Sequence, residues 1–97
     1  MLFYGTIDSF QVAMNFPSGG SSNGFGLPYQ FLKENYTTFK HEKNSGTGTL
    51  NVNGSNRTSG QIYNVADLTP QPWWGGSYEY ITIYGTASYG GTLYFLK

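Results

Sequence analysis

Residues that could carry out catalysis are few in this chain. Its 97 residues include one histidine, His41, and no cysteine. Nucleophilic catalysis needs a nucleophile, a base and a group that orients the base, and one histidine in a charged segment does not supply them. A single histidine without thiolates also lacks the donor set of an ordinary metal site. His41 is therefore interpreted as a surface residue with satisfied hydrogen bonds.

Carboxylates offer the next possible chemistry, because glycoside hydrolysis uses two of them across a cleft. Asp8, Asp67 and Glu79 are candidates, but a chain of this length leaves little room for a cleft. The glycine-rich stretch 18–26 lacks the preceding strand, following helix and lysine of a phosphate-binding loop. We expect no enzymatic activity, no cofactor and no bound metal.

Residues suited to binding are abundant instead. Nine tyrosines, seven phenylalanines and 14 glycines stand beside only five basic and five acidic residues. Within 67–76, Pro70 and Pro72 precede Trp73 and Trp74, and prolines lower the entropy cost of presenting neighbouring side chains. Adjacent residues of an extended segment point to opposite sides, so we expect one indole at the surface. The alternative is that both indoles pack in the core.

A ladder of tyrosines follows this loop. Between residues 77 and 84, Tyr78, Tyr80 and Tyr84 alternate with Ile81 and Ile83. If the isoleucines face the core, the tyrosines form a flat amphipathic platform on the other face. The predicted recognition surface consists of Trp73, Trp74, Tyr78, Tyr80, Asp67, Gln71 and Asn23.

The elements that must position these residues are short strands. Period-two alternation is clearest over 10–16, where Phe10, Val12, Met14 and Phe16 alternate with polar or small residues. Further strands are expected over 2–7, 36–42, 48–53, 61–66, 77–84 and 92–96, with 17–28 as a long loop and a helical turn beginning near residue 29. Asn53-Gly54 favours a tight hairpin turn, but the polar residues 55–60 favour a longer loop.

This pattern predicts an all-β fold. We expect a single small antiparallel β-sandwich or barrel of about six to eight short strands, with at most one short helical turn. The length predicts one domain over residues 1–97.

Charge excludes several partners. The formal net charge is zero and half of the charged residues lie between 33 and 43, which is typical of a solvated edge strand. Without a basic patch, nucleic acid is not an expected partner. No apolar run is long enough to span a bilayer, and Met1 is followed by no signal-peptide pattern. We therefore expect synthesis in the cytoplasm without a signal peptide, and action on a virion or outside the cell.

Function follows from these surfaces as an expectation. A neutral, aromatic, non-enzymatic chain suits a structural or assembly protein of a virion or similar particle, such as a phage decoration, tail or fibre subunit. Its partners would be copies of itself or other particle proteins. The alternative is a soluble carbohydrate-binding lectin whose aromatic rings stack on glycans. Contact area separates the two, because an assembly protein should bury well over ~1,000 Å² per contact.

Three segments also resemble a known family. Residues 15–20 (NFPSGG), 45–48 (SGTG) and 71–75 (QPWWG) are similar, in order and approximate spacing, to the three loops of chagasin-type cysteine protease inhibitors. The resemblance implies a small immunoglobulin-like β-sandwich that plugs a protease cleft. The chain departs from the family's pattern: Phe16 separates Asn15 from Pro17, the second loop lacks a glycine doublet, Gln71 replaces arginine, and two strands follow the third loop where about one would. A loop-wedge protease inhibitor is therefore the third and least favoured function.

Overall fold

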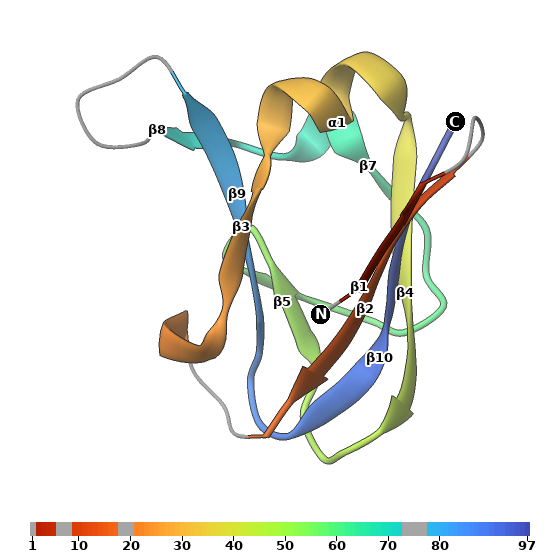
Figure 1. Ribbon diagram of the computed structural model, residues 1–97, viewed down its shortest axis with the longest axis vertical. Coiled ribbons are helices and arrows are strands. Elements are labelled where there is room, and N and C mark those ends of the chain that lie inside the picture. The colour runs from red at the N-terminus through yellow and green to blue at the C-terminus, as the bar shows by residue number, and fades with distance from the viewer. Residues whose placement is uncertain (1, 6–8, 18–20, 73–77) are drawn as a thin grey trace.

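The computed structural model describes residues 2–5, 9–17, 21–72 and 78–97, which form two facing antiparallel sheets (Figure 1). Sheet A has the order β1 (Leu2–Gly5), β2 (Ser9–Phe16), β10 (Tyr89–Leu96), β4 (Thr38–Ser45), β7 (Tyr63–Asn64). Sheet B has the order β3 (Phe25–Pro28), β9 (Glu79–Gly85), β5 (Leu50–Val52), β6 (Ser55–Arg57), and β8 (Gln71–Pro72) also pairs with β9. The predicted all-β sandwich is confirmed.

The described residues contain more strands than the six to eight expected. Two of the additional ones, β7 and β8, are only two residues long. Helical structure also exceeds the single predicted turn. The helix α1 (Tyr29–Asn35) has seven residues, which is about two turns. Two 3₁₀ turns, η1 (Ser21–Asn23) and η2 (Val65–Asp67), accompany it.

The core lies between the sheets and follows the predicted alternation. Val12 on β2, Leu93 on β10 and Ile83 on β9 are fully buried. On β5, Leu50 and Val52 also point inward and are fully buried, as their spacing predicted. An aromatic cluster fills one end of the core, consisting of Phe10, Tyr36, Phe39, Tyr63 and Phe95.

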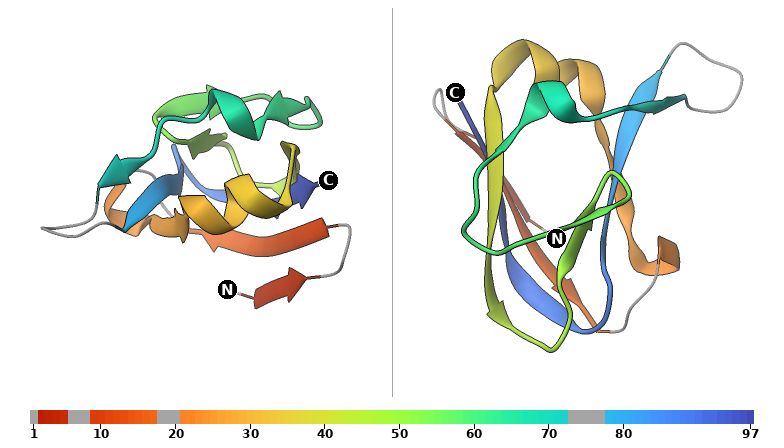
Figure 2. Two further views of the ribbon diagram at one scale, coloured as in Figure 1. Left: turned by 90° about the horizontal axis from the view of Figure 1, so that it is seen from above. Right: turned by 180° about the vertical axis from the view of Figure 1, so that it is seen from behind.

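The helix α1 covers one end of the sandwich (Figures 1 and 2), and its C-cap residue Tyr36 belongs to this aromatic cluster. Tyr29 and Leu32 face inward and are buried. Pro28 fixes an extended backbone just before the first turn, and Tyr36 ends the helix in an extended conformation. Phe31 is exposed on its outer side but meets Phe10 edge-on at 5.5 Å.

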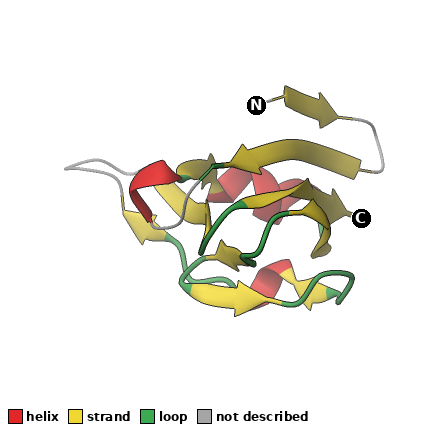
Figure 3. Ribbon diagram, turned by 90° about the horizontal axis from the view of Figure 1, so that it is seen from below, coloured by secondary structure: helices red, strands yellow, loops and turns green. Residues whose placement is uncertain are grey.

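β1 lies at the outer edge of sheet A, beside β2 (Figure 3). On the other side of β2, β10 pairs with it over eight residues. β10 is therefore a central strand with neighbours on both sides.

The segment 17–28 is not wholly a loop. Its last four residues form β3, which pairs with β9. Leu27 is 2 % exposed and Phe25 stacks on Phe16 at 6.2 Å. Because Gly24 and Gly26 alternate with these apolar residues, the segment carries a period-two strand pattern that its glycines obscured.

The Asn53-Gly54 turn joins β5 directly to β6, so the longer loop expected there is wrong. Val52 pairs with Ser55, and both turn residues have positive φ, 58° and 88°. This is the backbone that Asn-Gly favours in a two-residue hairpin. The Asn53 side chain also donates to the Thr69 carbonyl at 2.8 Å and accepts from its N–H at 2.7 Å.

The strand expected over 61–66 is reduced to β7. Val65 is buried in a 3₁₀ turn, whereas Ile62 is 51 % exposed. β7 pairs with only Thr38 and Phe39 of β4. Beyond Phe39, the polar loop before β7 takes the place of β7 along the edge of β4. There the Gly60 N–H donates to the His41 carbonyl at 2.7 Å.

Candidate functional site

The outer face of sheet B brings together several of the predicted binding residues. Ile81 and Ile83 are fully buried, so Tyr80, Thr82 and Tyr84 lie on the outward side of β9. We call this surface the tyrosine face and define it as Tyr80, Thr82 and Tyr84 of β9 with Gly26, Asn51 and Gln71. None of its residues is charged, so it favours neutral partners.

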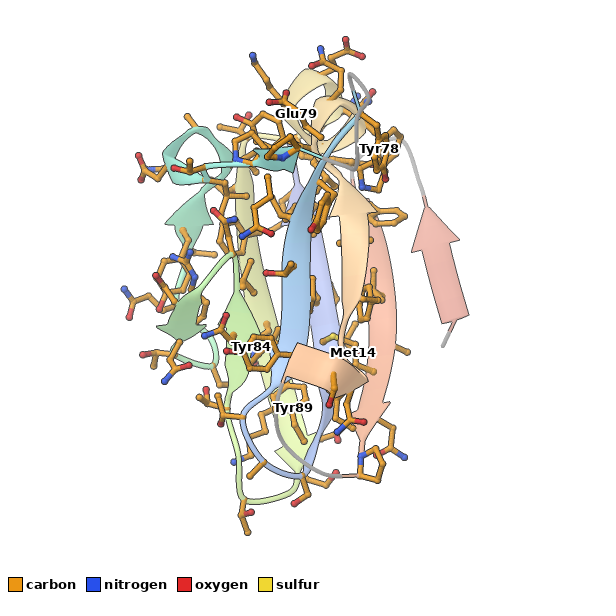
Figure 4. All side chains as sticks on the ribbon, turned by 90° about the vertical axis from the view of Figure 1, so that its left-hand side faces the viewer. Met14, Tyr78, Glu79, Tyr84 and Tyr89 are labelled. Atoms are coloured by element: carbon orange, nitrogen blue, oxygen red, sulfur yellow. The ribbon has the colours of Figure 1, made fainter. Side chains whose placement is uncertain are left out.

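Strand register fixes the rows of the tyrosine face. Tyr80 lies opposite Gln71 on one side and Pro28 on the other, Thr82 lies opposite Gly26, and Tyr84 lies opposite Asn51. Figure 4 looks onto this face, with Tyr84 toward the lower end of β9 and Tyr78 and Glu79 at its upper end.

A groove of about 340 Å³ crosses the tyrosine face. Gly26 makes room for the ring of Tyr80, because a Cβ at Gly26 would lie 2.9 Å from Tyr80 Cδ2. Gly24 likewise allows β3 to approach the backbone of Ile83. The ring of Tyr80 therefore lies against the backbone of β3 and forms one wall of the groove, with Thr82 and Gln71 beside it.

Some polar side chains of the tyrosine face form hydrogen bonds within the fold and others do not. Asn51 is committed within the fold: its Nδ2 donates to Asn56 Oδ1 and its Oδ1 accepts from Gly54 N–H, both at 3.0 Å. Among the described residues, the side chains of Gln71 and Thr82 form no hydrogen bond. The polar groups that line the groove can therefore serve a ligand.

The predicted site residues divide into three groups. Gln71 and Tyr80 line the groove, and Tyr78, 48 % exposed, directly precedes β9. Asn23 and Asp67 lie outside the groove. Trp73 and Trp74 lie outside the described residues.

Asp67 belongs to a different environment from the groove. It lies in η2, and its charge acts on Arg57, whose guanidinium lies 5.0 Å from the ring centre of Tyr63. Burial lowers the pKa of Arg57, and Tyr63 and Asp67 oppose that shift. Asp67 therefore acts electrostatically on Arg57 and does not line the groove.

Gly24, Gly26 and Thr82 belong to the groove but were not predicted. Assigning 17–28 to a loop hid the two glycines. The alternation of glycine with Phe25 and Leu27 could have revealed them.

A second cavity, of about 490 Å³, opens between β2 and the η1–β3 segment. Its lining is mostly apolar and includes Met14, Phe16 and Phe25, with Asn15 and Asn23 as polar groups. Both cavities are lined by Gly24 and Phe25, so they adjoin at the start of β3. Met14 appears at this position in Figure 4.

His41 is buried, at 1 % exposure, and not the surface residue expected from the sequence. It lies on the inward side of β4 because alternation places Lys40 and Glu42 outward. Its Nε2 lies 2.7 Å from the Arg57 carbonyl, and its Nδ1 lies 2.6 Å from Tyr89 Oη. Since a carbonyl only accepts, Nε2 carries the proton in the neutral ring and Nδ1 accepts from the tyrosine hydroxyl.

The outer face of β10 is a further exposed surface. Thr92, Tyr94 and Leu96 lie on it and are half-buried, whereas Leu93 and Phe95 on the inner face are fully buried. Lys40 Nζ lies 5.6 Å from the centre of the Tyr94 ring. We call Thr92, Tyr94 and Leu96 the β10 face.

The described residues of the three segments that resemble inhibitor loops do not gather at one place. Asn15 and Ser45 both pair with Gly90, so the first two segments are neighbours. The second also lies beside the last residue of β9, since Leu50 pairs with Gly85. Gln71, however, pairs with Tyr80 near the first residue of β9. The described part of the third segment therefore lies at the opposite end of β9.

Comparison with protein-family models, curated proteins and solved structures finds no match. Within the described ranges, no helix is long and apolar enough to cross a membrane. The same residues contain no group of three or more histidine, cysteine, aspartate or glutamate side chains that could hold a metal ion.

Proposed function

We propose that this protein is a non-enzymatic structural subunit of a virion or similar particle, which associates with copies of itself through aromatic surface contacts. The observation that carries the proposal is the incomplete burial of the β10 face. Tyr94 and Leu96 lie on a central strand of sheet A, yet both side chains are only half-buried by the rest of the molecule.

Burial of the β10 face in an assembly would add apolar contact area. The inner face of the same strand is fully buried at Leu93 and Phe95, whereas Tyr94 and Leu96 on its outer face remain partly exposed. Burying apolar surface is worth about 25 cal/mol per Å². A second molecule on the β10 face would therefore gain free energy without rearranging the sandwich.

Charge does not oppose this association. The formal net charge is zero, so two copies experience little long-range repulsion. The described charges nearest the β10 face, Lys40 and Glu42, form an ion pair at 3.3 Å. Association through this face should therefore be insensitive to salt.

Light scattering over a wide concentration range tests the proposal. The expected result is a mass that rises with protein concentration and is unchanged by added salt. Leu96→Asp should weaken association by about tenfold or more, equivalent to about 1.4 kcal/mol, because it places a charge in the contact. Ser55→Asp is the matched control, since it adds the same charge at an exposed position on β6 of sheet B. A wild-type chain that stays monomeric throughout contradicts self-association.

A further inference from the structure

We infer a second function for this protein: the groove of the tyrosine face binds a pyranose ring of a neutral glycan. The groove lies on sheet B and the β10 face lies on sheet A. The inference is therefore independent of the proposed assembly function.

Tyr80 provides the stacking surface. Its ring lies against the backbone at Gly26, and the residue as a whole is half-buried and lines the groove. A pyranose ring has an apolar face of C–H groups, which the negative face of an aromatic ring attracts. Because packing against Gly26 already restricts the Tyr80 ring, stacking a sugar on it costs little side-chain entropy.

Gln71 and Thr82 provide the polar contacts. Gln71 lies directly across from Tyr80, and Thr82 is two residues further along β9. An amide both donates and accepts, as does a hydroxyl, and sugar hydroxyls need both kinds of partner. An apolar wall flanked by a few fixed polar groups is the usual composition of a small-ligand site.

The absence of charge restricts the ligand to neutral sugars. All residues that line the groove are uncharged. Three described cations are engaged elsewhere: Lys33 lies over Tyr29, Lys40 over Tyr94, and Arg57 over Phe39 and Tyr63. Phosphorylated, sulfated or acidic sugars would thus find no charged partner in the groove.

The size of the groove also suits one sugar ring. At about 340 Å³ it lies near the lower limit of small-ligand sites, which span about 300–1,000 Å³. It lies on the sheet surface rather than inside the sandwich, so a glycan chain could extend beyond it. We therefore expect one well-contacted ring and millimolar affinity for single sugars.

Titration with simple sugars, followed by amide NMR, tests the inference. The probes are the methyl glycosides of glucose, galactose, mannose and N-acetylglucosamine. At least one should give saturable shifts centred on Gly26, Gln71 and Thr82. No saturable shift with any of the four overturns the inference, as do shifts centred on the Met14 cavity.

Substitutions identify the contacts. Tyr80→Ala should weaken binding by about tenfold or more, as expected for loss of a central aromatic contact. Tyr80→Leu keeps an apolar side chain over Gly26 and should weaken it similarly, so loss of binding is separable from loss of the fold. Thr82→Val should cost about threefold or more through the lost hydroxyl. Undiminished binding in both Tyr80 variants overturns the inference.

Tyr84→Ala is the matched control, because Tyr84 lies on the same face but does not line the groove. It should leave sugar binding unchanged, and an equal loss on this substitution would contradict the assignment to the groove. Light scattering on the same samples separates the two functions. A protein that associates but binds no sugar contradicts only this inference, and a monomer that binds sugar contradicts only the assembly proposal.

Discussion

At the residue scale, buried polar groups in this protein depend on glycines for space. Tyr89 reaches His41 because Gly91 has no side chain: a Cβ there would lie 2.6 Å from Tyr89 Oη. The hydroxyl then satisfies His41 Nδ1, and Arg57 satisfies Nε2 through its carbonyl. The histidine thus links β4, β6 and β10 in the interior.

Tyr89→Phe tests this link. The substitution keeps the ring but leaves the buried His41 Nδ1 without its partner, which should lower the free energy of unfolding by about 1–3 kcal/mol. Urea unfolding measures the change. Tyr94→Phe, on the half-buried outer face of the same strand, should change stability by less than about 0.5 kcal/mol. Equal effects of the two substitutions would show that the buried bond contributes nothing.

Tyr89 also predicts an alkaline loss of stability. Burial, reinforced by the charge of Glu42, raises the pKa of Tyr89 above its ordinary value. The unfolded chain therefore ionises this phenol first, near pH 10. Its contribution is fully present below that pH and is lost as pH rises, by up to about 1.4 kcal/mol per pH unit.

Urea unfolding between about pH 9 and pH 11 measures this loss. Tyr89→Phe has no phenol to ionise at this position, so its stability should fall less steeply than that of the wild type. The gap between the two proteins should therefore narrow as pH rises. Parallel profiles would mean that Tyr89 ionises equally easily in both states.

At the element scale, strands with strict alternation were predictable and interrupted ones were not. Residues 10–16 and 77–84 gave the correct inward faces because each apolar position recurs every second residue. β3 was missed because Gly26 and Pro28 occupy its outward positions and Gly24 precedes it, so the stretch has the composition of a loop. The strand expected over 61–66 was too long because nothing in the local sequence shows that residues 59 and 60 bind the edge of β4.

The β2 alternation makes a quantitative prediction. Val12 is fully buried and Gln11 is half-buried on the other face. Val12→Ala should lower the free energy of unfolding by roughly 1–4 kcal/mol through the cavity it leaves. Gln11→Ala should be nearly neutral. Chemical denaturation of the two variants measures both values, and the reverse ranking would contradict the register of β2 in sheet A.

At the scale of the whole molecule, the sandwich separates two surfaces that the sequence presented as one collection of aromatic residues. The tyrosine ladder was predictable from alternation with Ile81 and Ile83. Its groove was not, because Gly26 and Gln71 come from strands far apart in sequence that meet only across β9. Asp67 was assigned to the site because it precedes the tryptophan segment in sequence, but it does not line the groove.

This separation predicts that the two functions are independent. The tyrosine face and the β10 face lie on opposite outer sides of the sandwich, whose sheets should be about 10 Å apart. Substitutions at such separations usually add within about 0.5 kcal/mol. Leu96→Asp should therefore reduce self-association and leave the sugar-induced shifts at Gly26 and Thr82 unchanged, and Tyr80→Leu should do the opposite. The double variant, studied by light scattering and NMR, should show both losses with no coupling. A Tyr80 substitution that abolishes association would instead place the subunit contact on the tyrosine face.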